Sequence, residues 1–371
     1  MAKTFLGNDG GVGQFLINIP LPIGISFFTF EGISLVVDVF KEKYFEKKDA
    51  LSKSIVTHGQ RTLLFISFFP HLIAGPILKA HDFLPQITEK KIKAIQWETA
   101  FRNILLGYFL KLVVADNLKD FTYWMDFPYF QSRSSVTLIF LLIAYSCQIF
   151  ADFAGYSLIA IGLAKLFGYN FNPNFSFPYI STSFSEFWRR WHISLSSFLK
   201  EYLYIPMGGN RKGKIRTYLH LMITMILGGL WHGAAWSYAI WGAFHGIFLA
   251  IERLLVDYFG TINNRLFKVF KGFFVFACVT LIWLLFKLPN FSNVLGYLYC
   301  IKSNWYRGID MDMIQFILLY SLPVFLYHFY YLLKPGYSHV LKKYDHLVYG
   351  FLLFLIIFNS GSPGDFIYFQ F

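Results

Sequence analysis

The stretch VTLIFLLIAYSCQIFADFAGYSLIAIGLAKLF, residues 136–167, decides the fold class. Asp152 and Lys165 are its only charged residues, and it exceeds the roughly 20 apolar residues with which a helix crosses a bilayer. A helix that is apolar on all sides needs lipid or other protein around it rather than water. The stretch therefore predicts membrane helix: one tilted helix, a helix with a re-entrant piece, or two helices that meet at a glycine.

The rest of the chain has the same character. Hydrophobic residues make up 56% of the 371 positions and charged residues only 15%, which favours lipid over water as the surroundings. The candidate spans are residues 15–39, 62–79, 100–115, 136–167, 217–256, 272–301, 314–333 and 347–359. We expect an all-α polytopic membrane protein with eight to ten transmembrane helices plus interfacial or re-entrant helices, in a single domain of residues 1–371.

The net charge of +12 comes from lysines and arginines that lie in short clusters between the apolar runs. This placement is typical of membrane topology, and no nucleic-acid role is expected. Arg211, Lys212, Lys214 and Arg216 have no acidic neighbour in the sequence, and the positive-inside rule places them on the cytoplasmic side. Glycines interrupt the apolar run that follows Lys3, which argues against a cleavable signal peptide.

Common catalytic motifs are missing from the sequence. Cys147, Cys278 and Cys300 lie in apolar runs without the spacing of a metal site, so neither a disulfide framework nor a bound metal or cofactor is expected. The H-E-x-x-H, G-x-S-x-G, Walker and Rossmann patterns do not occur either. A histidine that acts as general base on an acceptor hydroxyl is compatible with this sequence.

Residues 171–206, FNPNFSFPYISTSFSEFWRRWHISLSSFLKEYLYIP, differ from everything around them. Pro173 and Pro178 disfavour helix before Ile180. Three residues can cap a helix that follows: Thr182, Ser183 and Ser185. We expect this helix to run through Trp188, Trp191 and His192 and to lie at the membrane interface or to dip into the protein from it.

His232 lies in LGGLWHGAAWSYAIWGAFHG, residues 227–246. An ionisable residue inside an apolar segment is a functional candidate, although it could instead bond a neighbouring helix. The glycines and alanines around it remove side-chain bulk and let a backbone or a substrate approach. We favour a functional role for His232.

The other candidates each have a structural alternative. His192 could orient a substrate or transfer a proton, or it could anchor the chain at the interface together with its neighbours Trp188, Arg189, Arg190 and Trp191. For the two arginines we favour contacts with lipid phosphates over substrate binding. Asp152 could orient a histidine or pair with an arginine, and we favour pairing. His71, His81 and His245 have no local feature that favours a functional over a structural role.

The sequence resembles the membrane-bound O-acyltransferase family. Four blocks occur in the family's order: PIGISFFTFEGISLVVDVF at 22–40, FFPHLIAGPILKAHDFLPQI at 68–87, residues 148–213 with FWRRWHISLS, and residues 227–246 with GGLWHGA. The resemblance covers residues 15–260 and is greatest to the bacterial alginate O-acetyltransferase membrane subunits, which are related to the teichoic-acid D-alanyltransferase membrane subunits.

The resemblance implies a site and a reaction. His232 matches the family's catalytic histidine and His192 its second functional position, with Trp188, Trp191, Arg189, Arg190 and Asp152 as substrate-binding candidates. It further implies a funnel through the bacterial inner membrane, where an acyl-CoA or acylated carrier protein and a cell-surface polysaccharide hydroxyl meet from opposite sides. Periplasmic or extracellular acetylation partners are expected.

Two alternatives stay open at this point. The transferred group could be D-alanyl or another acyl group on a different envelope polymer. A transporter or flippase would also contain a buried histidine, Asp152 and broken helices. The family carries further membrane helices before the block at 22–40, whereas only residues 1–21 precede it here, which predicts either a short form or an internal start and an incomplete funnel wall.

Overall fold

The computed structural model describes residues 24–41, 54–72, 75–233, 235–260, 264–362 and 364, with the backbone alone at 333–343. These residues form helices and contain no strand. The helices of the first half are α3 (Ile25–Lys41), α4 (Ile55–Ser67), α5 (Ala80–Phe83), α6 (Trp97–Tyr108), the π-helix η5 (Phe109–Ala115), α7 (Asp116–Thr122) and α8 (Ser135–Leu166). Those of the second half are α9 (Phe184–Arg190), α10 (Ile193–Leu199), the π-helix η9 (Lys200–Tyr204), α11 (Ile205–Met207), α12 (Lys214–Leu230), α13 (Trp236–Phe259), α14 (Arg265–Lys287), α15 (Phe291–Ser303), α16 (Met311–Lys343) and α17 (Asp345–Phe358).

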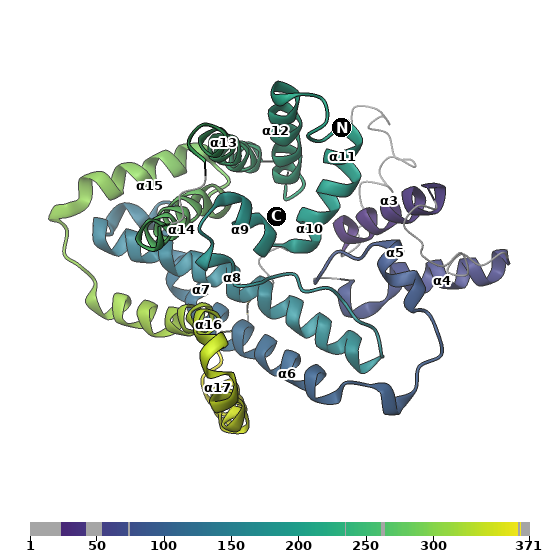
Figure 1. Cartoon of the computed structure of the whole chain (residues 1–371). Coiled ribbons are helices and arrows are strands. Elements are labelled where there is room, and N and C mark those ends of the chain that lie inside the picture. Colours follow the sequence, from purple (N-terminus) through teal and green to yellow (C-terminus); the bar gives the residue numbers. More distant parts are fainter. Residues whose placement is uncertain are drawn as a thin grey trace, which may run out of the picture.

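Helix α8 lies at the centre of the molecule. It begins after Ser134, whose side chain accepts a hydrogen bond from the backbone N–H of Thr137 at 3.2 Å. It packs against α6, α7, α14, α15 and α16 (Figure 1). A Cβ on Gly107 of α6 would lie 2.7 Å from the carbonyl oxygen of Gly155 of α8, so the two backbones touch. Small residues allow this close packing in membrane helices, where lipid provides no hydrophobic drive for association.

The structure shows how many helices each long apolar run forms. Residues 136–167 form one helix, α8, whereas residues 217–256 divide into α12 and α13. The run at 272–301 also divides, into α14 and α15. Of the run at 15–39, the part before Gly24 lies outside the described residues, as do the N-terminal residues that bear on a signal peptide.

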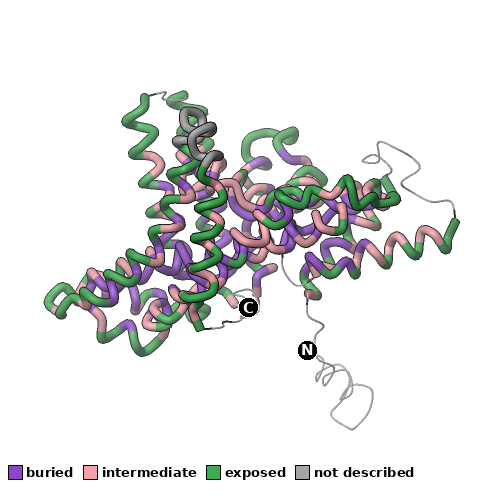
Figure 2. Tube along the Cα trace, turned by 90° about the horizontal axis from the view of Figure 1, so that it is seen from below, coloured by how far each residue is buried: buried purple, intermediate pink, exposed green. Residues whose placement is uncertain are grey.

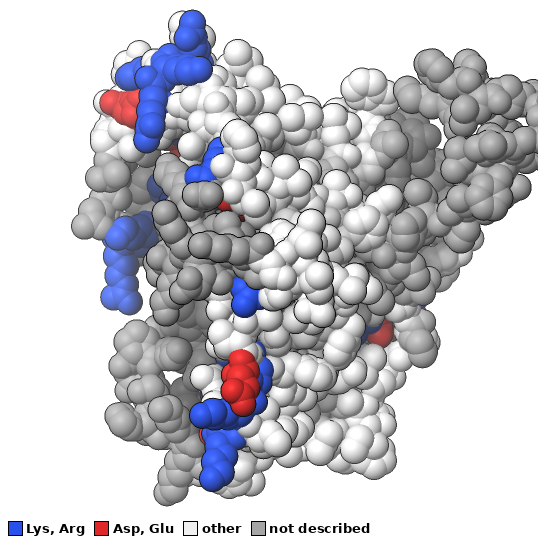
Figure 3. Space-filling view, turned by 90° about the vertical axis from the view of Figure 1, so that its right-hand side faces the viewer, with Lys and Arg blue, Asp and Glu red and all other residues white. Residues whose placement is uncertain are grey.

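Four helices in the described part of the chain are long and apolar enough to cross a membrane: Ser135–Leu166, Trp236–Phe259, Arg265–Lys287 and Met311–Leu332. The shorter helix Asp345–Phe358 is also apolar. The prediction of an all-α polytopic membrane protein is confirmed, while the number of eight to ten spans and the single domain stay predictions. In Figure 3 the lysines and arginines gather along the left edge, and most of the described surface beside them is uncharged.

The buried residues concentrate in the middle of the molecule, and the outer ends of the helices are exposed (Figure 2). The largest core cluster combines α8 with α14 and reaches Phe187, Trp191 and Trp241. A smaller cluster joins Phe27 and Phe30 of α3 to Leu195 and Phe198 of α10. The segment that contains α9 and α10 therefore lies between two packed groups of helices, and this places its histidine inside the protein.

Candidate active site

The chain breaks its helix at Trp191 and His192. Helix α9 ends at Arg190, Trp191 is extended with φ −103° and ψ 130°, and His192 adopts the left-handed conformation with φ 43° and ψ 55°. Helix α10 starts at the next residue, Ile193. The expectation of one helix through Trp188, Trp191 and His192 is therefore wrong. A left-handed non-glycine residue costs about 1–3 kcal/mol and persists only where its surroundings hold it.

Those surroundings are the segment from Asn174 to Ser176. The backbone N–H of Ser176 donates to the carbonyl oxygen of Arg190 at 2.9 Å, and that of Ile193 donates to the carbonyl oxygen of Asn174 at 2.9 Å. These long-range bonds compete with continued helix and turn the backbone. As a result Trp191 and His192 enter the core, where each is 1% exposed.

Helix α9 begins with a variant of the capping box, in which the carboxylate reaches the residue before the cap. The hydroxyl of Ser183 accepts from the N–H of Glu186 at 3.0 Å, and the Glu186 carboxylate accepts from the N–H of Thr182 at 2.8 Å. Ser183 is thus the cap among the three candidates. The same carboxylate pairs with Arg190 at 2.9 Å, four residues later. Arg190 is in this way part of the scaffold of α9.

The His192 ring is held by an amide and a hydroxyl. Its Nδ1 lies 3.2 Å from Oδ1 of Asn174 and 3.4 Å from Oγ of Ser194. Oδ1 of Asn174 also accepts from the hydroxyl of Ser194 at 2.8 Å and from its backbone N–H at 3.2 Å. Asn174 in turn donates to Oγ of Ser157 on α8 at 3.1 Å. The ring is therefore anchored to the central helix.

His232 lies in an aromatic setting in the turn after α12. The backbone N–H of His232 donates to the carbonyl oxygen of Gly229 at 3.0 Å. The ring centroid lies 4.9 Å from that of Trp231, 5.5 Å from that of Trp241 and 5.0 Å from that of Phe286. His232 is 6% exposed.

The two histidines meet at Trp231. The Trp231 ring lies 6.2 Å from the His192 ring and 4.9 Å from the His232 ring. Residues 40 positions apart in the sequence are thus brought into one buried group, as a shared site requires.

The glycines near His232 serve helix packing. A Cβ on Gly229 would clash with the carbonyl oxygen of Tyr238, and a Cβ on Gly242 would clash with that of Met225, so α12 and α13 touch along their backbones. At Gly233 the neighbour is the Tyr238 ring, 2.6 Å from the Cβ position. Of the two uses expected for these small residues, close approach of a backbone is the one observed.

The other predicted residues of this segment lie apart from the histidine pair or behind it. Trp191 packs in the core, with its ring 4.9 Å from Trp283 and 5.6 Å from Phe187. Trp188 packs against Trp241 and His245, at 5.7 Å and 5.0 Å. Arg189 is exposed and donates to Ser185 at 3.0 Å. Substrate contacts by these residues stay predictions.

Asp152 pairs with a lysine. Its carboxylate lies 2.8 Å from Nζ of Lys111, which also pairs with Asp116 at 2.6 Å and donates to the carbonyl oxygen of Gly364 at 3.1 Å. All three charged side chains are at least nine-tenths buried. The expected pairing occurs, but the cation is Lys111 of the π-helix η5 instead of an arginine. Sequence reasoning missed Lys111 and Asp116, although both are charged residues within an apolar stretch.

His71 and His81 pair with carboxylates of α3. Nε2 of His71 lies 2.6 Å from Glu31, and Nδ1 of His81 lies 2.8 Å from Asp38. Ser34, between them on α3, accepts from the N–H of Ala80 at 3.1 Å. The signal that could have found these pairs is the i, i+3, i+7 spacing of polar residues on one face of an apolar helix.

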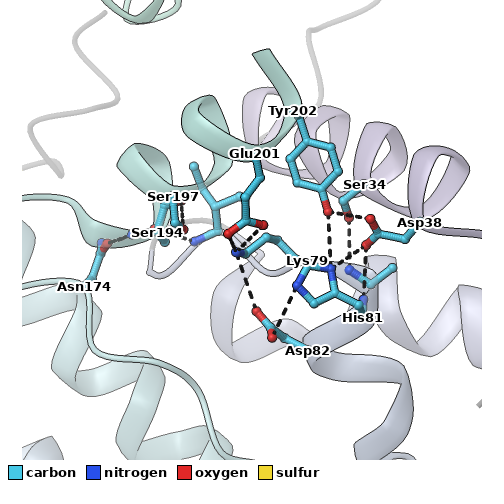
Figure 4. A network of polar contacts seen from close by, with 12 residues as sticks. Ser34, Asp38, Lys79, His81, Asp82, Asn174, Ser194, Ser197, Glu201 and Tyr202 are labelled. Carbon is cyan, nitrogen blue, oxygen red and sulfur yellow. Dashed lines mark hydrogen bonds and ion pairs between the residues drawn. The ribbon is translucent and has the colours of Figure 1, made fainter. Parts of the chain in front are cut away.

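A row of polar side chains, which we call the polar belt, leads from the His81–Asp38 pair beside α3 to Asn174, which holds His192. Figure 4 shows Asn174 and Ser194 at one end, the Lys79–Glu201 pair in the middle and Asp38, His81 and Tyr202 at the other end. Nζ of Lys79 lies 2.9 Å from both Glu201 oxygens, and the hydroxyl of Tyr202 donates to Asp38 at 2.7 Å.

A cavity of about 290 Å³ opens beside the Ser194 end of this belt. Its polar lining includes Lys79, Gln86, Asn170 and Ser197, and its wall includes Ser194, the neighbour of Asn174. The cavity is thus lined by Ser194, which donates a hydrogen bond to Asn174, and Asn174 in turn holds the His192 ring. No group of three or more His, Cys, Asp or Glu side chains within the described residues is arranged to hold a metal ion.

The basic cluster of residues 211–216 is exposed on the loop before α12 and on its first turn. The structure gives Lys214 an acidic neighbour that the sequence did not show, since it pairs with Asp257 of α13 at 3.2 Å. An exposed pair of this kind contributes about 0–1 kcal/mol. Most of the positive charge of the cluster is therefore available to an anionic partner.

The sequence model of the membrane-bound O-acyltransferase family matches residues 61–288, so the chain belongs to this family. The "Probable alginate O-acetylase AlgI" of Pseudomonas putida is 41% identical over 289 residues, which are 76% of this chain and 55% of that protein. The "Peptidoglycan O-acetyltransferase" of Helicobacter pylori is 32% identical over 348 residues, which are 83% of this chain and 64% of that protein.

A more distant relative is the "Teichoic acid D-alanyltransferase" of Bacillus subtilis, which is 29% identical over 238 residues, or 61% of this chain and 58% of that protein. The family resemblance found in the sequence is thereby confirmed. The chain spans about half the length of the alginate relatives it matches.

Proposed function

We propose that the chain belongs to a membrane O-acyltransferase that moves a short acyl group, acetyl, from an activated thioester to hydroxyls of a cell-surface polysaccharide. The observation that carries this proposal is the buried meeting of His192 and His232 at Trp231 in a chain of this family. The acceptor class is supported by the relatives, which are named for the acetylation of alginate and of peptidoglycan.

In the proposed reaction the acceptor hydroxyl attacks the thioester carbonyl carbon. A carbon–oxygen bond forms, the carbon–sulfur bond breaks, and the hydroxyl proton passes to the His232 ring, which returns it to the leaving thiolate. His192 orients the acceptor or balances charge as the oxyanion develops. The donor is an acyl-CoA or an acylated carrier protein, and the exposed basic cluster at 211–216 supports docking of its phosphates or acidic surface.

The multi-pass membrane location follows from the apolar helices and the family. We place the protein in the bacterial inner membrane with the basic cluster on the cytoplasmic side, in keeping with the positive-inside rule. The polymer outside then receives its acyl group from a donor inside, with acetylation partner proteins beyond the membrane. Proteolysis of spheroplasts from either side at residues 211–216 tests this orientation.

Replacement of His232 by Ala is the test of the reaction. We expect at least a hundredfold loss of transfer, because a general base contributes about 10²–10⁴ to the rate. The measurement is the number of hydroxylamine-labile acyl groups on the surface polymer, with the mass of the released group distinguishing acetyl from D-alanyl.

His328→Ala is the matched control for this test. His328 is also buried, at 3% exposed, but its ring packs on Phe150 and Tyr179 at 4.9 Å and 5.3 Å. The His328→Ala substitution creates a comparable cavity in the core, away from Trp231. Equal transfer by the His232→Ala variant and wild type would exclude His232 as the base, and substrate movement without new ester bonds would point to a transporter.

A further inference from the structure

We propose that Asn174 is a positioning residue that fixes the His192 ring with its proton on Nδ1, so that Nε2 carries the lone pair. The proposal rests on the proposed function for its catalytic meaning, but its structural content stands on the contacts of Asn174. Asn174 is 1% exposed and lies in the loop between α8 and α9.

The identity of the oxygen on Asn174 is fixed by its other partners. The atom that faces His192 also accepts from the backbone N–H of Ser194 at 3.2 Å, and an N–H can only donate. The opposite end of the amide donates to Oγ of Ser157 at 3.1 Å. A flipped amide would place an NH₂ group against the N–H of Ser194, which leaves two donors facing each other.

The protonation of His192 follows from this assignment. Nδ1 lies 3.2 Å from an oxygen that accepts, so Nδ1 carries the hydrogen. A neutral imidazole has one hydrogen, and its lone pair then lies on Nε2. The nearby Ser194 hydroxyl does not offer an alternative acceptor of equal quality, since it is farther away, at 3.4 Å.

The hydrogen of the Ser194 hydroxyl is also accounted for. It is donated to the same oxygen of Asn174 at 2.8 Å, while its own oxygen accepts from the N–H of Ile77 at 2.9 Å. Oδ1 of Asn174 therefore accepts from three donors, one on His192, which precedes α10, and two on Ser194 in its first turn. It supports the left-handed turn at His192 and the ring orientation together.

The consequence for the reaction is a division of roles. With its lone pair on Nε2, His192 accepts a hydrogen bond and can hold an acceptor hydroxyl, while the second histidine takes the proton. Among the described residues, the groups against the His192 ring include Asn174, Ser194, Phe153 at 4.6 Å and Trp231 at 6.2 Å, and Trp231 also contacts the titratable His232. The positioning of His192 thus depends on a residue that does not itself reach the reacting atoms.

The direct test is the nitrogen-15 NMR spectrum of the full chain, labelled on histidine and held in lipid nanodiscs. A His192→Gln variant assigns the His192 signals. We expect wild-type protein to show a protonated-type signal at Nδ1 and an unprotonated-type signal at Nε2. The opposite pattern would overturn the proposal whether or not the protein transfers acyl groups.

Two substitutions at position 174 sharpen the test. Asn174→Leu removes the acceptor, and we expect the His192 signals to change to mixed tautomers. Asn174→Asp keeps an acceptor and adds charge, so we expect the wild-type tautomer and an acidic limb of the transfer-against-pH profile that shifts upward by more than half a pH unit, because the carboxylate stabilises imidazolium. Asn172→Leu and Asn172→Asp are matched controls on an exposed residue two positions away.

The outcomes are separable. An unchanged tautomer in Asn174→Leu overturns the proposal, and so does an unshifted pH profile in Asn174→Asp if the Leu variant fails to fold. The expected tautomers together with no acyl transfer in any variant would leave Asn174 as the positioning residue and reject the proposed function instead.

Discussion

His71 beside α3 and the two histidines at the centre are buried and His81 is partly buried, yet different partners hold the two groups. His71 and His81 each contact a carboxylate of α3, at 2.6 Å and 2.8 Å. His192 bonds an amide and a hydroxyl, and His232 lies among aromatic rings. A carboxylate favours the protonated form of a histidine ring and ties the ring in place, which fits a structural role, whereas an amide fixes the ring without favouring its charged form.

The largest effect is expected from breaking the Glu31–His71 pair, which is the more buried of the two histidine–carboxylate pairs beside α3. Glu31 is 1% exposed and His71 is 0% exposed, so Glu31→Ala leaves the ring's polar nitrogens buried without their carboxylate. We expect a loss of about 3–5 kcal/mol in stability, measured as thermal unfolding in detergent.

Two variants control the Glu31 experiment. Lys214→Ala breaks the exposed pair with Asp257, in which the lysine side chain is 79% exposed, and should cost at most about 1 kcal/mol. The double variant Glu31→Leu with His71→Leu should recover much of the loss, because it removes both polar groups together. If Glu31→Ala and Lys214→Ala lowered the unfolding temperature equally, the flank pair would not be structural.

The central site is expected to respond to a smaller change in packing. A methyl group at Gly229 would clash with the carbonyl oxygen of Tyr238 and force α12 and α13 apart. We expect Gly229→Ala to cost about 1–3 kcal/mol in stability by overpacking. Acyl transfer should fall as well, since the N–H of His232 bonds to the carbonyl oxygen of Gly229.

The matched glycine for this experiment is Gly272 of α14. A Cβ there would lie 3.8 Å from the carbonyl oxygen of Ser181, which is ordinary contact. Gly272→Ala should therefore leave stability and transfer at wild-type levels or raise stability slightly. Transfer by Gly229→Ala at the wild-type rate would show that the α12–α13 approach does not position His232.

The smallest effect is a pH dependence at His81. Burial lowers the pKa of this ring, but the hydrogen bond to Asp38 and the charge of Asp82 outweigh it, so the pKa lies above its ordinary value of 6.5. Because the folded pKa is raised, the stabilisation is fully present below pH 6.5 and is lost as the pH rises through the folded pKa.

The measurement is the difference in unfolding temperature between wild type and His81→Gln from pH 6 to pH 9. We expect a contribution of about 1 kcal/mol at the acidic end that declines towards the basic end. Phosphate and Tris buffers at equal ionic strength serve as controls. A difference that stayed constant across this range would remove protonation from the account of this pair.

The helices and the two histidines follow from local sequence, whereas several site contacts do not. The apolar run at 136–167 predicts α8 because transfer to lipid depends on composition and length. The turn at His192 escaped prediction because FWRRWHISLS contains no proline or glycine that would stop a helix, and the bonds that end the helix come from Asn174 and Ser176. Asn174 itself has no local feature that distinguishes it from Asn172.

The sequence by itself determined the membrane class and the family resemblance and singled out His192 and His232 as candidates, because these depend on composition and on short motifs. The tertiary structure alone decided that the two histidines share Trp231, that Asp152 pairs with Lys111, and that His71 and His81 are tied to α3. The physical reason is that a buried polar group must find its partner wherever the fold brings one, and distance along the chain does not indicate which one that is.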